Sequence, residues 1–302
     1  MLNLPACWNW DLRSVFKRWK GHCQICSIMS ELLGNKFIGN GRLMDVTVYE
    51  HFGELAESQP SVYEVIRVEE GIPLFFEDYM KRLENSFHLL NRDLPLSIDQ
   101  IAAGIHMLVK VNAHKSGPVK LIFAAGDLQF SIFFIMKPHL PRAEEYVTGV
   151  KTVFMHETRS NPNLKMWNRG LRDRSVDLLS KTSAYEAVLV NEEGLITEAS
   201  RSNVFFIHGH DVFTSGDDLV LPGITRKKVL EVCHQLDTPV HFTSLPSASV
   251  GEYDSCFLTG TARKIVPVRM IGEHHFQVDT PMLRKISEGF ETYVSQYLEG
   301  HL

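Results

Sequence analysis

The chain has 302 residues, of which 44% are hydrophobic and 22% charged, a length and balance that exclude a disordered or fibrous protein and favour two globular domains. Thirty-six acidic residues against 31 basic ones give a formal net charge of −5, so the chain lacks the basic field of a dedicated nucleic-acid-binding protein. The longest apolar runs, such as residues 130–136, are far shorter than the roughly 20 residues that span a membrane. We therefore expect neither a nucleic-acid nor a membrane partner.

Residues 1–28 are predicted to be a non-catalytic N-terminal extension. They combine tryptophans with a basic cluster and have no long apolar core of the kind that a secretory signal needs. A transit peptide is the alternative, although an aspartate is present and serines are few. The five cysteines are odd in number and irregularly spaced, which favours a reducing, cytoplasmic compartment over a disulfide framework. Cys23 and Cys26 form a C-x-x-C pair, a weak signal for a zinc or redox site; two ordinary thiols are the preferred interpretation.

Residues 29–137 are predicted to form a small domain with segregated strands and helices. Short strands with turn residues between them are expected from about residue 36 to 75, the clearest over residues 62–68. Apolar residues at three- and four-residue spacing predict a helix over residues 76–91, and Ser97 is a suitable N-cap for a second helix. The apolar runs 119–124 and 128–134 flank a short turn and predict a hairpin.

Residues 138–145 are polar and contain prolines, so they are predicted to link the small domain to a large one over residues 146–302. In this second half, strands are expected at residues 150–154, 185–190, 195–197, 204–207 and 212–213, and helices at residues 171–181, 225–235 and 281–297. No metal-binding motif or Walker loop occurs, so no metal site is predicted.

Two segments of the second half place reactive side chains beside predicted elements. Lys165 lies among apolar and aromatic neighbours, where partial burial would lower the pKa of its amine and favour the free base that a Schiff-base lysine needs. A lysine that reaches solvent along its stem is the alternative. Glu198 ends a predicted strand and is followed by hydroxyls and backbone N–H groups that can hold an anion. A solvated turn is the alternative there.

Two further segments can supply hydrogen-bond donors to an anion. Residues 221–226 lead into a predicted helix, and the free N–H groups and the Thr225 hydroxyl at its start suit a phosphate. A Thr225 that only caps the helix is the alternative. Residues 258–262 end a strand with small hydroxylated residues that can add donors to the same anion. The four segments are informative only in combination.

In this order and at these distances, the four segments resemble the fold-type IV pyridoxal-phosphate enzymes, which include branched-chain and D-amino-acid aminotransferases and aminodeoxychorismate lyase. The resemblance runs from about Val62 to Val268 and is carried by EAVLVNEEGLITEASRSNVFF, LPGITR and LTGTARKIVPV, with YEVIRV and YMKRLENSF in the first half. It implies an α+β fold with a small α/β domain and a larger β-barrel-like domain with flanking helices. It also implies pyridoxal 5′-phosphate as cofactor, amino acid and 2-oxo acid substrates, and a homodimer.

The resemblance assigns a role to each matching residue. Lys165 matches the lysine that forms the Schiff base and moves the substrate's Cα proton, and Glu198 matches the glutamate that keeps the pyridine nitrogen protonated. The other cofactor contacts implied are Arg82, Ser202, Asn203, Ile224, Thr225 and Thr261. The helical periodicity places Arg82 off the apolar face, free to point into a cleft. The implied substrate residues are Tyr63, Gly260 and Ala262, and Arg201 is the nearest basic candidate for the substrate carboxylate, with a solvated loop arginine as the alternative.

The departures from the family pattern concern the substrate. The Tyr-x-Arg of the branched-chain enzymes is replaced by SGPVK at residues 116–120, and the arginine of the D-amino-acid enzymes falls at or near Ala125. Gly170 stands where the branched-chain enzymes have a tyrosine. The cofactor half of the site is therefore intact, whereas neither carboxylate anchor of the family is present.

Three hypotheses follow. The leading one is an aminotransferase that moves an amino group between a branched-chain-like amino acid and a 2-oxo acid. The second is a β-eliminating lyase of the aminodeoxychorismate type, because LKMWNRGL at residues 164–171 also resembles the lysine segment of that enzyme. The third is a cofactor-binding protein without efficient turnover, suggested by the missing anchors.

Overall fold

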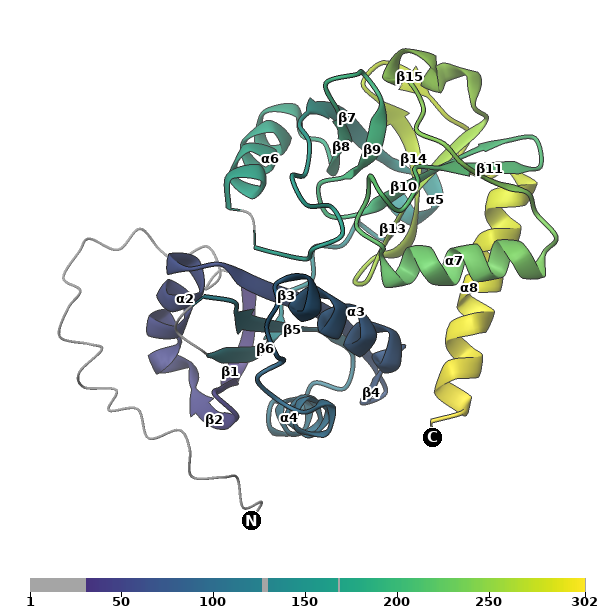
Figure 1. Cartoon of the computed structure of the whole chain (residues 1–302). Helices are drawn as coiled ribbons and strands as arrows, with labels where there is room; N and C mark the ends of the chain where they lie inside the picture. The colour runs from purple at the N-terminus through teal and green to yellow at the C-terminus, as the bar shows by residue number, and fades with distance from the viewer. Residues whose placement is uncertain (1–30, 127–129, 168, 302) are drawn as a thin grey trace.

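The computed structural model describes residues 31–126, 130–167 and 169–301, and its strands form two sheets. Figure 1 shows the sheet of the first half below that of the second. The first sheet is antiparallel throughout, with strand order β2-β1-β6-β5-β3-β4. Its strands are β1 (Leu32–Gly39), β2 (Arg42–Asp45), β3 (Ser61–Glu69), β4 (Ile72–Pro73), β5 (Gly117–Ala124) and β6 (Ser131–Met136). The predicted strand 62–68 and the hairpin strands are therefore confirmed, with residues 127–129 of the connection outside the described residues.

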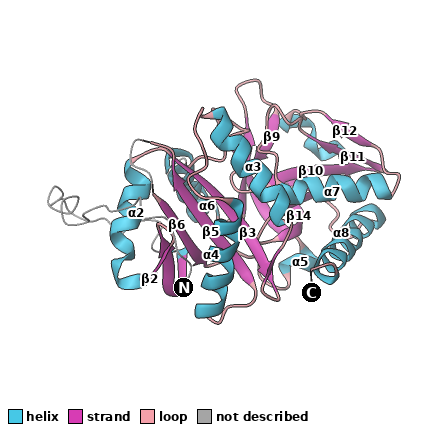
Figure 2. Ribbon diagram, turned by 60° about the horizontal axis from the view of Figure 1, so that its bottom comes forward, coloured by secondary structure: helices cyan, strands magenta, loops and turns pink. Residues whose placement is uncertain are grey.

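Three α-helices accompany this sheet: α2 (Tyr49–Ser58), α3 (Phe76–Leu89) and α4 (Ile98–Val111). The helix α4 begins as predicted, because Ser97 accepts a hydrogen bond from the backbone N–H of Gln100 and the Gln100 side chain accepts one from that of Ser97. Figure 2 shows α2 at the outer end of the first sheet and α3 on the side that faces the second half.

The prediction of short strands alone over residues 36–75 was wrong at α2. The β-branched run Val46–Val48 forms a 3-10 turn capped by Asp45, and the chain then continues as an α-helix. Tyr49, Phe52 and Ala56 are buried at helical spacing, and the ring centroids of Phe37 and Tyr49 lie 5.0 Å apart. Packing against the sheet therefore outweighs the local β-propensity of this segment.

The second sheet is mixed and has the strand order β12-β11-β10-β13-β14-β7-β8-β9, with β15 paired to β14. Its strands are β7 (Val150–His156), β8 (Glu186–Val190), β9 (Ile196–Ala199), β10 (Asn203–His208), β11 (Asp211–Thr214), β12 (Val240–Phe242), β13 (Ser255–Gly260), β14 (Lys264–Ile271) and β15 (His274–His275). The pairs β7–β8, β7–β14 and β11–β12 are parallel. The curled sheet and the separate helices confirm the predicted α+β fold class.

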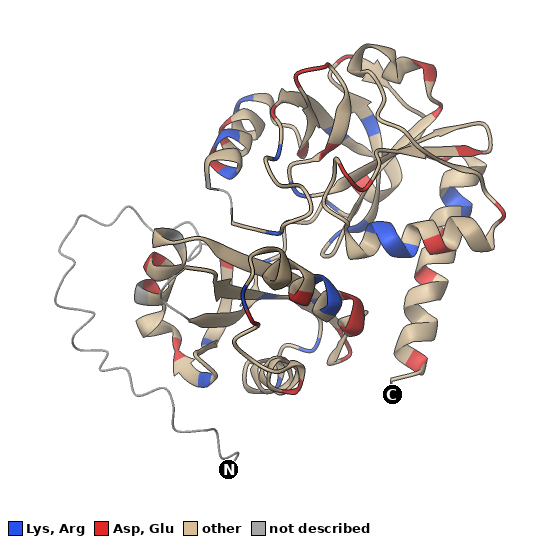
Figure 3. Cartoon of the chain, viewed as in Figure 1, with Lys and Arg blue, Asp and Glu red and all other residues tan. Residues whose placement is uncertain are grey.

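The helices of the second half lie on the outside of this sheet. They are α5 (Glu145–Thr148), α6 (Arg169–Thr182), α7 (Ile224–Gln235) and α8 (Pro281–Glu299), with a 3-10 segment at Ser247–Glu252. The last three α-helices agree with the predicted ones to within a few residues. Basic and acidic positions are interspersed along α6 (Figure 3). None of the helices in the described part of the chain is long and apolar enough to cross a membrane.

The two halves meet along a short stretch of backbone pairing that positions the site. The N–H of Tyr63 in β3 donates to the carbonyl of Lys165 at 3.0 Å, and the N–H of Trp167 donates to the carbonyl of Ser61 at 2.9 Å. Arg67, also in β3, donates to the carbonyl of Ala262 at 2.6 Å. The first sheet thereby holds both the lysine segment and the loop after β13.

Candidate active site

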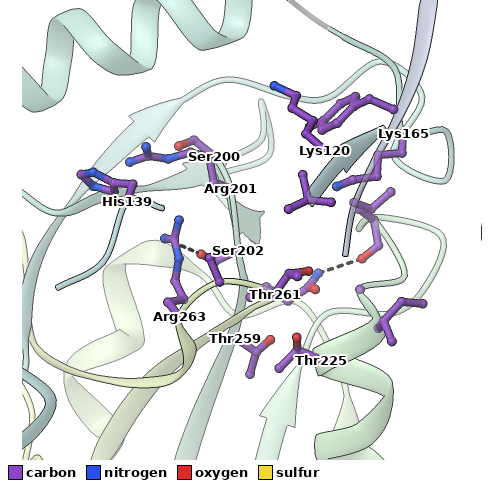
Figure 4. A pocket seen from close by; sticks show the side chains of 18 of the residues that line it. Lys120, His139, Lys165, Ser200, Arg201, Ser202, Thr225, Thr259, Thr261 and Arg263 are labelled. Carbon is purple, nitrogen blue, oxygen red and sulfur yellow. Dashed lines mark hydrogen bonds between the residues drawn. The ribbon is translucent and has the colours of Figure 1, made fainter. Parts of the chain in front are cut away.

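A cavity of about 180 Å³ lies where the two halves meet. In the view of Figure 4, Lys120 and Lys165 lie on one side of it, His139, Arg201 and Arg263 on the other, and three threonines below. Every residue that the sequence assigned to the site lines this cavity, from both halves of the chain: Tyr63, Arg82, Lys165, Glu198, Arg201, Ser202, Asn203, Ile224, Thr225, Gly260, Thr261 and Ala262. The structure therefore brings the predicted residues together, while their roles remain predictions.

The Lys165 amine has the environment that its predicted role needs. Burial lowers its pKa, an effect that Tyr63 and Glu64 oppose and the nearby guanidinium groups of Arg82 and Arg159 reinforce. Its Nζ lies 4.7 Å from the centroid of the Tyr63 ring. A larger fraction of this amine is therefore neutral at physiological pH than for an exposed lysine, which favours its reaction with a carbonyl group.

Tyr63 lies among cations. Burial alone would raise the pKa of its hydroxyl, but the charges of Lys165, Arg159 and Lys120 outweigh that effect and hold the pKa below its ordinary value. The ring also contacts Trp167 edge-on, with centroids 5.7 Å apart. Tyr63 is thus an aromatic wall of the cavity whose hydroxyl is easier to ionise than that of a free tyrosine.

The start of α7 has the features of an anion site. Gly223 precedes this helix and offers no side-chain cap, so the first N–H groups, at Ile224 and Thr225, have no partner within the helix. A Cβ on Gly223 would lie 2.2 Å from Oδ1 of Asn203, whose Nδ2 donates to the carbonyl of Leu221 at 2.8 Å. Asn203 therefore holds the loop in place and requires glycine at its end.

Two hydroxyls complete this anion site from β13 and the loop after it. The Thr261 hydroxyl lies 2.7 Å from that of Tyr79. The hydroxyl of Thr259 is buried and has no hydrogen-bond partner within the described residues. An unsatisfied buried donor beside a helix N-terminus is what a bound phosphate would satisfy, so this end of the cavity fits a phosphate group.

Arg82 lines the cavity, as expected of a side chain off the apolar face that points into a cleft, but it is paired rather than free. Its side chain is buried, and its guanidinium donates to both carboxylate oxygens of Glu64, at 2.8 and 2.5 Å, and to the carbonyl of Pro222 at 3.1 Å. Burial alone would lower the pKa of Arg82, but Glu64 keeps it raised. Because Pro222 belongs to the loop before α7, Arg82 still adds positive charge to the anion site.

Replacement of Glu64 by glutamine is expected to destabilise the protein. Both members of the Glu64–Arg82 pair are buried, so the neutral amide would leave the guanidinium charge uncompensated, at a cost of about 3–5 kcal/mol in the free energy of unfolding. Urea unfolding of the cofactor-free protein measures this. Glu157→Gln, which breaks an exposed pair with Arg174, is the control and should cost less than about 1 kcal/mol. Equal effects of the two substitutions would contradict the assignment of a buried, energetically coupled pair.

The Glu198 carboxylate is buried and positioned by two donors. Nε of Arg159 donates to its Oε1 at 2.7 Å, and the backbone N–H of Leu221 donates to its Oε2 at 3.2 Å. Burial alone would lower the pKa of Arg159, but Glu198 holds it above its ordinary value. The two donors hold this carboxylate in a fixed position at the cavity, where it can serve as the partner for a ring nitrogen.

Glu186, at the start of β8, organises the turn after Glu198. Its buried carboxylate accepts hydrogen bonds from Arg263 at 2.6 Å, from Ser202 at 3.2 Å and from Ser200. Nε of Arg201 lies 3.7 Å from the same carboxylate, and the Arg201 side chain is 36% exposed. Nη2 of Arg201 also donates to the carbonyl of Tyr185 at 3.3 Å, so Arg201 is engaged by two neighbours while part of its side chain is exposed at the cavity.

Several charged residues of the cavity were not predicted from the sequence: Glu31, Lys120, Lys137, Arg159, Arg172 and Arg263. Lys120 ends the stretch SGPVK, which we interpreted as lacking a carboxylate anchor, but its amine lies in the cavity. Arg172 lies on α6, directly after the lysine segment. The signal in the sequence was Trp167, an aromatic residue inside the lysine segment that can attract cations. In the structure its ring contacts both Lys120 and Arg172.

Comparison with known proteins decides the family. The family described as Amino-transferase class IV matches residues 61–271, more than two thirds of the chain. The chain belongs to this family. A D-alanine aminotransferase from Bacillus licheniformis is 27% identical, over 78% of this chain and 88% of its own length. A probable branched-chain-amino-acid aminotransferase from Thermotoga maritima is 28% identical, over 78% of this chain and 87% of its own length. Membership confirms both the resemblance and the enzyme class.

Solved structures of this aminotransferase family share the fold. The branched-chain amino acid aminotransferase of Escherichia coli has a TM-score of 0.76 at 21% identity and covers 87% of this chain and 95% of its own. A protein of Legionella pneumophila described as a 4-amino-4-deoxychorismate lyase has a TM-score of 0.69 at 23% identity. The match covers 78% of this chain and 91% of the Legionella chain. The fold-type IV architecture is therefore confirmed.

Class IV aminotransferases use pyridoxal phosphate, and the cavity fits that group. The helix start at Ile224 and Thr225 and the unsatisfied hydroxyl of Thr259 suit its phosphate. Glu198 suits its ring nitrogen, and the partly neutral amine of Lys165 suits its aldehyde. The residues present thus supply a complementary group for each of these polar parts of the cofactor.

Proposed function

We propose that the protein is a pyridoxal-phosphate-dependent aminotransferase that moves an amino group between a branched-chain-like amino acid and a 2-oxo acid. The observation that carries the proposal is one cavity holding a desolvated lysine, a buried glutamate and an open helix N-terminus. The similarity to curated branched-chain and D-alanine aminotransferases over most of the chain supports transamination.

Each of the chain's own groups has a defined task in this proposal. Lys165 would hold the cofactor through its amine and, when free, would take up the proton lost from the substrate's Cα and return it. Glu198, positioned by Arg159, would pair with the ring nitrogen and keep it protonated. The bound cofactor supplies an electron-withdrawing ring that stabilises the charge left at Cα. Thr225, Thr261 and Arg82 hold the phosphate.

Arg201 is proposed to bind the substrate carboxylate, because it lines the cavity and its side chain is partly exposed. Arg201→Ala is expected to raise the KM for amino donors by roughly one to two orders of magnitude, which corresponds to the loss of about 1.5–3 kcal/mol for a charge-assisted hydrogen bond. Steady-state kinetics measure it, with the exposed Arg142, which is not among the residues that line the cavity, replaced by alanine as the control. An unchanged KM, or an equal loss of cofactor affinity, would remove Arg201 from the substrate site.

The lyase is the second candidate function, favoured by LKMWNRGL and by the fold that the chain shares with the Legionella pneumophila protein. A panel of amino donors with 2-oxoglutarate, assayed beside pyruvate release from aminodeoxychorismate, separates the two activities. Amino transfer from leucine, isoleucine or valine without pyruvate release is the expected result. Pyruvate release without amino transfer would establish the lyase, and the absence of both would leave a cofactor-binding protein without efficient turnover.

We also propose a homodimer with residues 29–137 as the small domain, 138–145 as the linker and 146–302 as the large, cofactor-binding domain. The division follows the two sheets, since β1 to β6 end at Met136 and β7 begins at Val150. The proposed compartment is the cytoplasm, because the five cysteines are odd in number and irregularly spaced. The predicted extension, residues 1–28, and the pair Cys23 and Cys26 lie outside the described residues.

A further inference from the structure

A tyrosine behind the cavity wall contacts one of the hydroxyls of the anion site. Tyr79 lies near the start of α3, in the first half of the chain, and is 2% exposed. Its hydroxyl lies 2.7 Å from that of Thr261, which belongs to the loop after β13 in the second half. Thr261 lines the cavity, as Figure 4 shows, whereas Tyr79 is not among the described residues that line it. Tyr79 therefore acts on the anion site through Thr261.

The direction of this hydrogen bond follows from the burial of Tyr79. Burial raises the pKa of Tyr79 to about 12, so its hydroxyl keeps its proton at physiological pH. Thr261 is the hydrogen-bond partner of this hydroxyl within the described residues. If Thr261 donated instead, the phenolic proton would be buried without an acceptor, which native structures avoid. Tyr79 is therefore the donor, and the proton of the Thr261 hydroxyl is left for an acceptor in the cavity.

Helix α3 is fixed against α7, whose start supplies the free N–H groups of the anion site. The carboxylate of Asp78, the residue before Tyr79, lies 2.8 Å from Nζ of Lys228 in α7. One turn farther along α3, the guanidinium of Arg82 lies 5.4 Å from the centroid of the Tyr79 ring and donates to the carbonyl of Pro222 in the loop before α7. The Tyr79 hydroxyl is therefore presented from an element that the anion site itself holds in place.

We infer that Tyr79 is a positioning residue for the cofactor phosphate, because it orients the Thr261 hydroxyl so that this hydroxyl donates into the anion site. A residue of the first half thereby strengthens the binding of a phosphate held by the second half, although it does not line the cavity. The inference rests on the phosphate position that the proposed function assigns to the start of α7, and it adds a residue to that site. It does not depend on which substrate the protein takes.

Binding of two forms of the cofactor tests the inference without requiring turnover. The dissociation constants of pyridoxal phosphate and of pyridoxal, which lacks the phosphate, are measured by absorbance titration of the full chain freed of its cofactor. Both ligands carry the same aldehyde, so the ratio of the two constants isolates the contribution of the phosphate. In Tyr79→Phe, pyridoxal phosphate is expected to bind about three- to tenfold more weakly, as for one weakened hydrogen bond, while pyridoxal changes less than about twofold. An unchanged ratio would overturn the inference, whether both ligands weaken equally or neither does.

Two further variants make the result specific to the contact between Tyr79 and Thr261. Tyr293→Phe removes another tyrosine hydroxyl, which donates to Glu231 outside the cavity lining, and should alter neither affinity. Thr261→Val should lower the preference for pyridoxal phosphate, and adding Tyr79→Phe to it should change the ratio less than about twofold further. The full effect of Tyr79→Phe in the Thr261→Val background would contradict an action through Thr261.

The inference stays testable if Tyr79→Phe does not fold. Thr261→Ser keeps a hydroxyl for Tyr79 and should retain the ratio of the two dissociation constants, whereas Thr261→Val should lose it; an unchanged ratio in Thr261→Val would overturn the inference.

The failure of this inference is also distinguishable from a failure of the proposed function. If branched-chain donors do not transfer their amino group in the unsubstituted protein, the aminotransferase proposal fails, and the two dissociation constants still report on Tyr79. If transfer occurs and the ratio does not move in Tyr79→Phe, only the role of Tyr79 is overturned.

Discussion

Lys165→Ala is expected to abolish amino transfer and the visible absorbance of the lysine-bound cofactor, while the protein keeps its fold. Among the described residues that line the cavity, lysines occur at positions 120, 137 and 165, and Lys165 is the one that matches the family's lysine. Without this amine the chain loses both the group that attaches the cofactor and the base that takes up the Cα proton. Turnover should therefore fall by at least the 10²–10⁴-fold of one lost general base. Absorbance spectra and steady-state assays of the purified variant measure both effects.

Two control variants make this result interpretable. Lys227→Ala removes an exposed lysine of α7 that pairs with Asp78 outside the cavity lining, and should leave the spectrum and the activity unchanged. Lys120→Ala should keep the spectrum, because the amine of Lys120 is engaged by Glu31. A normal cofactor spectrum in Lys165→Ala, or its loss in Lys120→Ala alone, would assign the attachment to another lysine.

Glu198→Gln is expected to retain the cofactor but to slow removal of the Cα proton by roughly 10²–10³-fold or more. The amide cannot keep the ring nitrogen protonated, so the ring withdraws electrons less strongly. The amide oxygen can still accept from Arg159 or from the N–H of Leu221, so the loop and the anion site should stay in place. Stopped-flow absorbance after mixing with an amino donor measures the rate of the half-reaction.

The comparison variant for this experiment is Glu192→Gln, in the exposed turn between β8 and β9, which should react at the unsubstituted rate. Deuteration of the substrate at Cα adds a second readout, because a slower proton transfer should increase the isotope effect on the half-reaction. An unchanged rate and isotope effect in Glu198→Gln would count against the role of Glu198 at the ring nitrogen.

The parts of the fold that the sequence predicted are those specified by local patterns. The helices α4, α7 and α8 carry apolar residues at helical spacing and follow the N-cap residues Ser97, Gly223 and Thr280, so periodicity and start signals agree. Helix α2 was missed because its apolar residues follow a β-branched run and are fixed by contact with side chains of the sheet, among them Phe37 and Phe134. Such a contact has no local signature.

The site divides in the same way. Lys165, Glu198 and Thr225 lie in contiguous segments with a recognisable order, so they could be named in advance. Lys120 could not, because β5 is buried along almost its whole length and shows no alternation that would mark a side chain facing a cavity. Its partner Glu31 is brought to it by the pairing of β1 with β6 and of β6 with β5, and Arg172 follows the lysine segment, which pairs with β3. These three residues come from segments that are distant in the sequence, so only the tertiary structure shows that they meet.

The central claim is that this cavity transfers an amino group, and a single-turnover reaction tests it most directly. The purified protein loaded with pyridoxal phosphate is mixed with L-leucine, and in parallel with D-leucine, in the absence of any 2-oxo acid. The account predicts that one enantiomer converts the cofactor to its pyridoxamine form and releases 4-methyl-2-oxopentanoate in an amount equal to the active sites. No conversion with these or other amino donors, together with pyruvate release from aminodeoxychorismate, would contradict it.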